Sequence, residues 1–348
     1  MASRFTIGAA LAAAVTVLAP GAWAEDFYKG KTVTIVTSTG AGGGYDLIAR
    51  AIARSMGAHL PGKPGMIVQN MPGGGNLLAT NYMYNIAPKD GTVIATINNA
   101  MPLQQTLKNK GVRFDARKFN WLGSTGASNE VVFTWHTTGV KTLDDARRKE
   151  VILGGTGPAS SIVIFPTAMN NLLGTKFKIV TGYKSSSEID VVLERGEVLA
   201  RSNSYASLVS KRPQWIKEKK ISIIVQVGAK RDEGLPNVPL LSELATNDED
   251  RQALQLISSP ILLGRPYLAP PETVVDRVAL LRKAFDATMA DKGFKAEVAR
   301  LKLDLDPIPA ETLAKTVNET VNAPDAVIAK AIAAMPKAGP KKSKKKSS

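Results

Sequence analysis

The sequence predicts an α/β fold built on parallel strands, and three observations carry that prediction. Runs rich in β-branched residues alternate with segments whose apolar residues recur at helical spacing. Three of these runs end in a glycine-rich turn that opens a helix, at residues 40–44, 73–75 and 154–157. The chain has 348 residues, which is enough for two domains of ordinary size, so we expect two domains assembled from parallel βαβ units.

The first unit reads TVTIVTSTGAGGGYDLIARAIAR from residue 32 and shows how strand, turn and helix follow one another. Residues 33–37 are suited to a buried strand, and residues 47–56 place apolar side chains on one helix face. The turn between them exposes backbone N–H groups at the positive end of a helix dipole, where proteins bind anions. The hydroxyls of Thr37, Ser38 and Thr39 can add donors.

Two known kinds of phosphate-binding loop do not fit this turn. No Lys-Ser or Lys-Thr pair follows the glycines, which excludes a P-loop. The third glycine of the dinucleotide fingerprint is replaced by Tyr45 or Leu47, and the next strand ends in Asn70 instead of the acid that holds a ribose. From the turn alone, a tight packing turn and a site for the carboxylate of a small ligand both stay open.

The later units place polar groups where strands end. The strand at 92–97 ends at Asn98, and a second-half strand at 151–153 runs into the hydroxyl-rich turn GGTGPASS. In parallel α/β sheets, ligands bind beyond the carboxyl ends of the strands. We therefore expect Asn98 and the 73–75 loop to share one rim with the first turn, and residues 156–161 to offer similar donors from the second half.

Composition and motifs give no support for catalysis. The chain has no cysteine, and His59 and His136 have no partner at the spacing of a metal site or a catalytic triad. No G-x-S-x-G motif or obvious acid pair is present, and we expect Asp46 to support the first turn. The prediction is therefore no enzyme, no cofactor and no metal. Turnover of a candidate acid would overturn it.

The formal charge is +15, and it falls to +8 without Arg4 and the six lysines after residue 336. Nucleic acid, an acidic membrane surface and small anions are the partners that such a charge can favour. The basic residues are dispersed, with no aromatic-interleaved patch and no nucleic-acid motif, so we expect no nucleic-acid binding. We expect the lysine-rich tail, residues 337–348, to be disordered and solvated.

The first 24 residues predict a secretory signal peptide. Arg4 precedes an apolar run at 5–18, and Ala22-Trp23-Ala24 matches a small-x-small cleavage site. We expect cleavage after Ala24 and a periplasmic location, because no later run is long and apolar enough to span a bilayer.

Seven segments stand in one order along the chain: AGGGYDLIAR, QNMPGGGNLLA, APKDGTVIAT, GGTGPASS, GYKSSSEIDVVLERGEV, AKRDEGLPNVPLLSEL and GRPYLAPPETVVDRV. Together they resemble the substrate-binding proteins of tripartite tricarboxylate transporters, also called the Bug family, over nearly the whole mature chain. Three positions depart from that family. Ser38-Thr39 replaces the usual Pro-Phe, apolar residues 162–164 stand where a His often follows the serine pair, and Ser185 replaces the usual Gly.

The resemblance implies a type II periplasmic binding protein, in which two doubly wound α/β lobes joined by a two-crossover hinge close on a ligand. Lobe 1 would comprise residues 25–128 and 227–336, and lobe 2 would comprise residues 129–226. The family binds small organic acids, mostly di- and tricarboxylates, also aromatic acids, and a few amino acids or amides. By analogy, the first turn and the 156–161 loop grip one carboxylate from the two lobes.

The resemblance further implies a monomer that delivers its carboxylate ligand to membrane subunits of the tripartite tricarboxylate type. The alternative that stays open is a sensor that presents the same acid to a histidine kinase. Lys184 and Arg201 are candidates for a charge facing a second carboxylate, and each can equally be a surface cation. The predicted ligand-binding residues are Thr37, Ser38, Thr39, Gly42, Gly43, Tyr45, Asn98, Thr156, Gly157, Ser160, Ser161 and Asn203.

Overall fold

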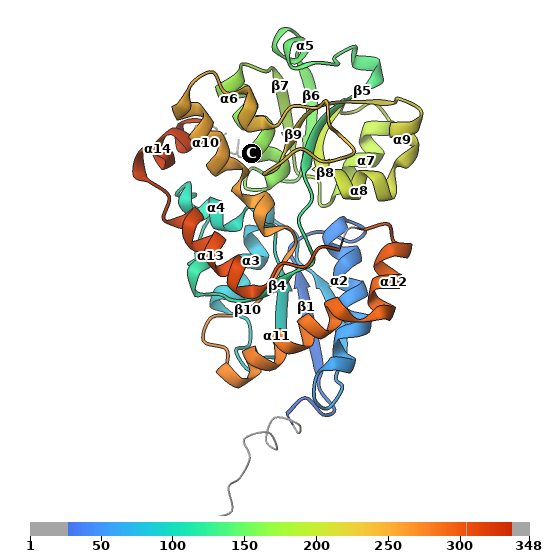
Figure 1. The fold of residues 1–348 in the computed structure, drawn as a ribbon, viewed down its shortest axis with the longest axis vertical. Helices are drawn as coiled ribbons and strands as arrows, with labels where there is room; N and C mark the ends of the chain where they lie inside the picture. The colour runs from blue at the N-terminus through green and yellow to red at the C-terminus, as the bar shows by residue number, and fades with distance from the viewer. Residues whose placement is uncertain (1–26, 304, 336–348) are drawn as a thin grey trace, which may run out of the picture.

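A computed structural model describes residues 27–303 and 305–335, and these residues form two lobes, each built on a five-stranded sheet (Figure 1). The first sheet has the order β2-β1-β3-β10-β4 and the second the order β7-β6-β8-β5-β9. The strands of the first sheet are β1 (Thr32–Thr37), β2 (Gly65–Asn70), β3 (Val93–Thr96), β4 (Asn120–Ser124) and β10 (Pro266–Ala269). Those of the second are β5 (Glu130–Trp135), β6 (Val151–Gly155), β7 (Phe177–Thr181), β8 (Ala200–Ser204) and β9 (Ile221–Val227).

In each sheet four strands run in one direction, and the fifth runs antiparallel between two of them. In the first sheet, β1 pairs in parallel with β2 and β3, and β10 runs antiparallel between β3 and β4. In the second sheet, β6 pairs in parallel with β7 and β8, and β5 runs antiparallel to both β8 and β9. The carboxyl ends of β1 and β3 therefore lie beside the start of β10, and the carboxyl end of β8 lies beside the start of β5.

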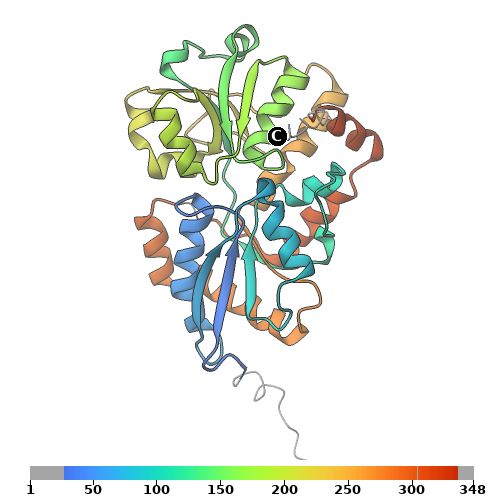
Figure 2. The ribbon, with the colours of Figure 1, turned by 180° about the vertical axis from the view of Figure 1, so that it is seen from behind.

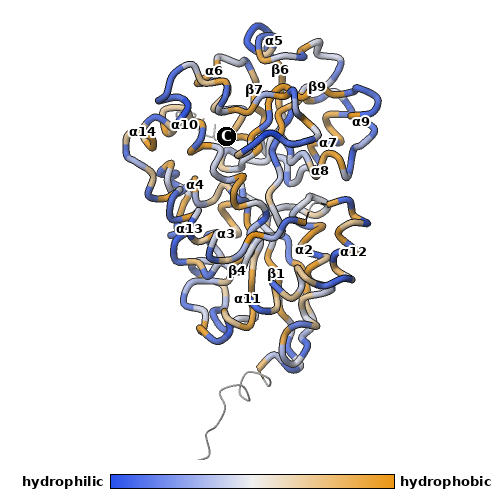
Figure 3. Tube along the Cα trace, viewed as in Figure 1, coloured by the Kyte–Doolittle hydropathy of each residue, from blue (hydrophilic) through white to orange (hydrophobic). Residues whose placement is uncertain are grey.

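The helices of the first lobe cover its sheet from both sides. They are α2 (Gly44–Ser55), α3 (Leu77–Asn85), α4 (Met101–Thr106), α11 (Val275–Ala290), α12 (Lys292–Arg300) and α13 (Ala310–Val321). One apolar cluster joins α2 and α11 to the sheet, and another joins α3 and α13 to the opposite face. This is why the strands read as nearly continuous apolar runs, which Figure 3 shows as the hydrophobic colour at the centre of each lobe.

The helices around the second sheet are α5 (Leu143–Arg148), α6 (Ser161–Leu173), α7 (Ser186–Glu194), α8 (Tyr205–Lys211), α9 (Pro213–Lys217), α10 (Asp248–Ser258) and α14 (Asp325–Ala333). The last two come from the stretch that we expected in lobe 1. The helix α10 packs against α6 and α14, and its Leu254 and Ile257 share an apolar cluster with Leu153 and Phe165 of the second lobe. The packing of α10 and α14 therefore differs from the expected assignment of residues 227–336.

Three connections cross between the lobes. Residues 125–129 lead from β4 to β5, and residues 259–265 lead from α10 back to β10. The first lies at the expected boundary after residue 128, whereas the second was expected near residue 227 and lies later, because α10 still packs on the second lobe. Residues 322–324 add a third, because they carry the chain from α13 to α14, and the reverse view of Figure 2 shows that end of the chain returning to the upper lobe.

The expected signal peptide, with its cleavage after Ala24, and the lysine-rich tail lie outside the described residues. Within residues 27–303 and 305–335, no helix combines the length and the apolar character that a membrane span requires. The two-lobed α/β architecture is the predicted fold class, and its strand edges determine which residues meet between the lobes.

Candidate functional site

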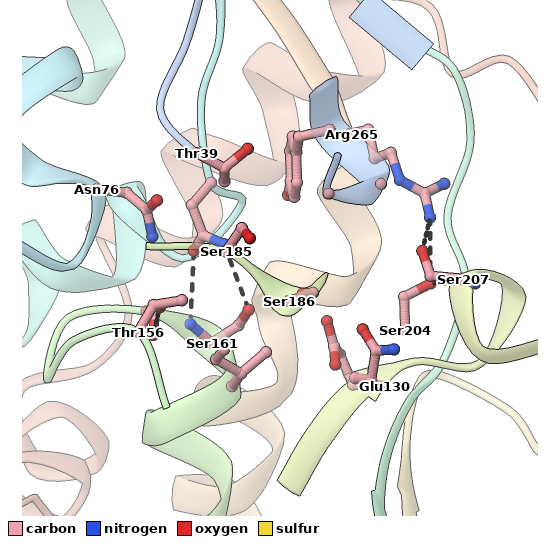
Figure 4. Close-up of a pocket in the computed structure, with 17 residues that line it drawn as sticks. Thr39, Asn76, Glu130, Thr156, Ser161, Ser185, Ser186, Ser204, Ser207 and Arg265 are labelled. Carbon is pink, nitrogen blue, oxygen red and sulfur yellow. Dashed lines mark hydrogen bonds between the residues drawn. The ribbon is translucent and has the colours of Figure 1, made fainter. Parts of the chain in front are cut away.

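A cavity lies between the lobes where the edges of the two sheets face each other (Figure 4). Its empty space, including the part open to solvent, is about 530 Å³. Eight of the twelve predicted ligand-binding residues line it: Thr39, Gly43, Tyr45, Asn98, Thr156, Ser160, Ser161 and Asn203.

The wall from the first lobe is the amino-terminal turn of α2. Gly43 is the N-cap residue and Gly44 the first residue of this helix, and no side chain caps it, so the first N–H groups have no partner within the helix. Both glycines line the cavity. Asp46 supports the turn from behind, because its carboxylate accepts from the N–H of Gly42 at 2.9 Å and from Nδ2 of Asn70 at 2.9 Å. The helix dipole adds positive potential at the same point.

The wall from the second lobe is the amino-terminal turn of α6. Ser160 is the N-cap residue with extended backbone angles, and its hydroxyl accepts from Thr156 at 2.9 Å while donating to the carbonyl of Gly157 at 2.8 Å. Ser161 begins the helix and faces the cavity. Two helix starts, one from each lobe, therefore present backbone donors to one space.

Asn98, which follows β3, connects the two walls. Its amide Nδ2 lies 3.4 Å from the hydroxyl of Ser161, and its Oδ1 lies 3.5 Å from the Ser161 N–H. Its own N–H donates to the hydroxyl of Ser38 at 2.9 Å. Ser38 and Thr37 are buried behind the wall and do not line the cavity; Thr37 Oγ1 lies 3.3 Å from Thr39 Oγ1. These two residues support the site instead of facing the ligand space.

Gly42 also lies outside the cavity lining and makes contacts across the lobes. Its carbonyl accepts from the Ser187 hydroxyl at 2.8 Å and from the ammonium group of Lys211, both of the second lobe. Two residues earlier, the N–H of Gly40 donates to the carbonyl of Lys184 at 3.1 Å. The first glycine turn thus forms the helix start and also holds the lobes together.

Gly157, the fourth predicted residue that does not line the cavity, packs against the second glycine loop. A Cβ at Gly157 would lie 2.7 Å from the Cα of Gly75, which is closer than real side chains approach. Gly75 has a φ of +67°, and a Cβ there would lie 2.8 Å from the backbone nitrogen of Ala159. The two glycines therefore allow the backbones of the two lobes to touch.

Two charged residues that sequence reasoning missed line the cavity. Glu130 is the first residue of β5, and Arg265 directly precedes β10; both are more than 90% buried. One Arg265 nitrogen donates to the hydroxyls of Ser204 and Ser207 at 3.1 and 3.2 Å, from the first lobe to the second. Burial raises the pKa of Glu130 to about 7, although Arg201 and Arg265 draw it down.

The two candidate cations suggested by the sequence lie elsewhere. Arg201 is fully buried and forms an ion pair with Asp190, which Arg212 also approaches at 3.5 Å. Desolvation lowers the pKa of Arg201, while Asp190 opposes this. Lys184 is exposed and does not line the central cavity. Of these cations, Arg265 is the one that lines the central cavity.

Polar side chains complete the lining. Asn76, Ser185 and Ser186 line the cavity, and none of them was predicted. Ser185 caps α7, accepting from the N–H of Glu188 at 3.3 Å, at the position where the resembling family usually has Gly. Among the described residues, no group of three or more His, Asp or Glu side chains could hold a metal ion. The donor set thus consists of backbone N–H groups, hydroxyls, amides and Arg265.

Comparison with known proteins identifies a family whose sequence profile matches this chain and solved structures that share its fold. The sequence profile of the tripartite tricarboxylate transporter family receptor matches residues 48–332. The UPF0065 protein in the gbd 5′ region of Cupriavidus necator is 25% identical over 340 residues, covering 94% of this chain and 96% of its own.

Two solved structures share the fold at low sequence identity. The periplasmic binding protein BugD has a TM-score of 0.70 at 19% identity, covering 88% of this chain and 99% of its own. MatC from Rhodopseudomonas palustris, solved with bound malate, has a TM-score of 0.68 at 19% identity, covering 86% and 99%. A family profile that spans most of the chain, on this fold, shows that the protein belongs to the tripartite tricarboxylate transporter family of receptors, which are periplasmic solute-binding proteins.

Proposed function

We propose that this receptor captures a small organic acid in the cavity between its lobes and delivers it to a tripartite tricarboxylate-type membrane transporter. The observation that carries the proposal is the meeting of two helix starts, α2 of the first lobe and α6 of the second, at one cavity. A carboxylate between them receives backbone N–H groups from both lobes, so the ligand stabilises the lobes in contact.

The chemistry of the lining suits an anion of modest size. Hydroxyls and backbone N–H groups that are already aimed at one space can bind a carboxylate without a metal, and ordered water can bridge the remaining distance. A dissociation constant in the micromolar range requires about −8 kcal/mol, which a few charge-assisted hydrogen bonds and partial burial of the carbon skeleton can provide. MatC with malate and a related Rhodopseudomonas palustris structure with adipate support carboxylates as the ligand class.

A thermal-shift screen followed by calorimetry tests the proposal. Purified mature protein is screened against di- and tricarboxylates, aromatic acids and amino acids, and the ligand should raise the melting temperature, because it binds the folded state alone. At a concentration one hundred times Kd the expected stabilisation is about 2.7 kcal/mol. If no organic acid at millimolar concentration shifts the melting temperature or gives a heat of binding, the proposal is wrong.

Two further measurements address the partner and the absence of catalysis. Affinity capture from detergent-solubilised membranes, with and without the ligand, should retain transporter membrane subunits; retention of a histidine kinase instead would indicate a sensor.

The bound acid should be recovered unchanged after prolonged incubation, as judged by NMR of the released ligand. A new product formed at a rate proportional to protein concentration would indicate an enzyme.

A further inference from the structure

The cavity contains a carboxylate that the protein leaves almost without partners. Glu130 is only 8% exposed, and within the described part of the chain its carboxylate has one hydrogen-bond partner, the Ser202 hydroxyl, at a long 3.4 Å. Among the described residues, no Lys, Arg or His nitrogen lies within 4.0 Å of it. Figure 4 shows the carboxylate directed into the open space of the cavity.

The two nearest arginines do not neutralise this carboxylate by contact. The guanidinium group of Arg201 is bound to Asp190 and to the carbonyls of Ser186 and Ser202. Arg265 donates to hydroxyls of the second lobe. A buried charge without close partners is costly, so a site that keeps one is arranged for a partner that arrives with the ligand.

A second acceptor lies in the adjoining part of the cavity. Asn99 lines this part together with Glu130 and Arg265, and its Oδ1 is buried without a hydrogen-bond partner among the described residues. The opposite end of the cavity, around Thr39, Thr156 and Ser161, presents donors (Figure 4). The cavity therefore has donors for an anion at one end, and at the other end it has the Glu130 carboxylate as an acceptor beside Arg265, one nitrogen of which is already bound to Ser204 and Ser207.

We propose that the ligand of this receptor carries a protonated amine in addition to its carboxylate, and that Glu130 binds the amine. This inference rests on the proposed function and narrows its substrate class to amino-substituted organic acids. A carboxylate ligand without the amine would bring a second negative charge toward Glu130. The amine removes this penalty, since an ammonium group is positively charged and has three donors and no acceptor.

Acids that differ only in one substituent test the proposal in the unmodified protein. Succinate, L-malate and L-aspartate share one four-carbon skeleton, and glutarate and L-glutamate, or butyrate and 4-aminobutyrate, give further pairs at other lengths. By calorimetry at pH 7.5, the amino member of the best-fitting series should bind at least tenfold tighter than the unsubstituted member. Equal affinity, or tightest binding of the hydroxyl member, would contradict the proposal.

The substitution Glu130→Gln tests whether Glu130 causes the tighter binding of the amino-substituted acid. The substitution keeps the shape and removes the charge, so it should weaken the amino member at least tenfold, while the unsubstituted member should bind as well as before or tighter, because the repulsion from Glu130 is gone. Glu150→Gln is the matched control, because it removes the same charge from an exposed residue of the same lobe and should change neither affinity. An amino preference that survives Glu130→Gln would overturn the role of Glu130.

The pH dependence of ligand affinity distinguishes a Glu130 that binds the amine from a Glu130 that only supports the fold. The groups that face Glu130 with charge are Arg201 of β8 and Arg265 before β10, and the Tyr45 hydroxyl of α2 lies near it as a neutral group. With the pKa of Glu130 raised to about 7, affinity for the amino member should increase between pH 6 and pH 8 as Glu130 ionises. An affinity that falls over this interval would indicate a protonated Glu130 donating to the ligand instead.

The same binding experiments separate two questions: whether the protein binds an organic acid, and whether Glu130 binds an amine on that acid. If unsubstituted acids bind and the amino members do not bind tighter, the receptor function stands and the amine is wrong. If no member of any series binds, both are wrong.

Discussion

Gly43 is the residue that best tests whether the start of α2 binds an anion. It precedes α2 with a φ of −74°, an ordinary value for any residue, and a Cβ there would meet only the carbonyl oxygen of Gly40 at 3.6 Å and the Thr39 hydroxyl at 3.8 Å. A small side chain therefore fits at Gly43, in contrast to Gly44, where a Cβ would lie 2.6 Å from the Ser207 hydroxyl. Substitutions at position 43 can therefore separate the effect of a charge on binding from the effect of a steric clash.

Gly43→Asp should weaken binding of the best acid about a hundredfold while leaving the fold intact. A new carboxylate about 5 Å from the bound one costs roughly 3 kcal/mol at an effective dielectric constant near 20. Calorimetry of the variant is compared with Gly43→Asn, which has the same shape without the charge, and with Gly43→Ala. If Asp and Asn weaken binding equally, the effect is steric and the helix start does not hold the anion.

The residues missed from the sequence have a common physical explanation. The strand-end rule directs attention to residues that follow parallel strands, and three residues that it indicates, Thr39, Asn98 and Thr156, line the cavity. Glu130 instead begins its strand, and Arg265 directly precedes its own. They reach the same edges because β5 and β10 run antiparallel to their neighbours, and the direction of pairing is not visible in a hydrophobic run.

At the scale of elements, the first strand-turn-helix unit depends on a carboxylate that faces away from the ligand. Asp46 is buried, and burial by itself raises its pKa, but hydrogen bonds from Arg50, from the Gly42 N–H and from Asn70 outweigh this and hold the pKa below its ordinary value. Asn70 ends β2 and also donates to the carbonyl of Thr39 at 3.0 Å. The turn is therefore held by β2 as well as by its own helix.

Asp46→Asn should lower the free energy of unfolding by about 1 to 3 kcal/mol at pH 7, because buried donors lose their charged acceptor. The folded-state pKa is depressed, so this stabilisation is present above the unfolded value near 4 and is lost as the pH falls through the folded-state value. Urea unfolding at a series of pH values should therefore show the difference between the two proteins shrinking below about pH 4.

The matched control is Asp276→Asn, which removes an exposed carboxylate from the first turn of α11. It should change the free energy of unfolding by less than about 0.5 kcal/mol. A difference between wild type and Asp46→Asn that stays constant from pH 7 to pH 3 would contradict the account of the turn.

The order of strands, turns and helices was predictable at this scale, because β-branched runs, glycine turns and helical periodicity are local signals. The side on which α10 packs was not. Its apolar face, with Leu254 and Ile257, fits any apolar sheet surface of sufficient size, and only the three-dimensional structure shows that it joins the cluster around Phe165. Packing partners between distant elements leave no periodic signature in one sequence.

At the scale of the whole molecule, the glycine loops determine how closely the lobes approach. The contact of Gly157 with Gly75 and the hydrogen bond from Gly40 to Lys184 bring backbone against backbone beside the cavity. Glycine turns thus have two roles here, since they open helices toward the ligand and let the lobes meet. A sequence gives no means of separating these roles, because both require the same residue.

Gly157→Ala should prevent full contact of the lobes and weaken the ligand about tenfold. The added methyl group would lie 2.7 Å from the Gly75 backbone, while the backbone at Gly157 itself does not require glycine. Small-angle scattering should show a larger radius of gyration for the ligand-bound variant than for ligand-bound wild type. Gly65→Ala is the control, because nothing lies within 4 Å of its Cβ. Unchanged affinity and radius in Gly157→Ala would contradict the closure model.

A crystal structure of the protein with the acid that binds best in the screen would show directly whether the two helix starts hold a carboxylate. The account predicts one carboxylate of that acid between the two lobes, with its oxygens hydrogen-bonded, directly or through one water, to the N–H groups that start α2 at Gly44 and α6 at Ser161. An acid bound outside this cavity, or bound inside it with its carboxylate turned away from both helix starts, would contradict the account.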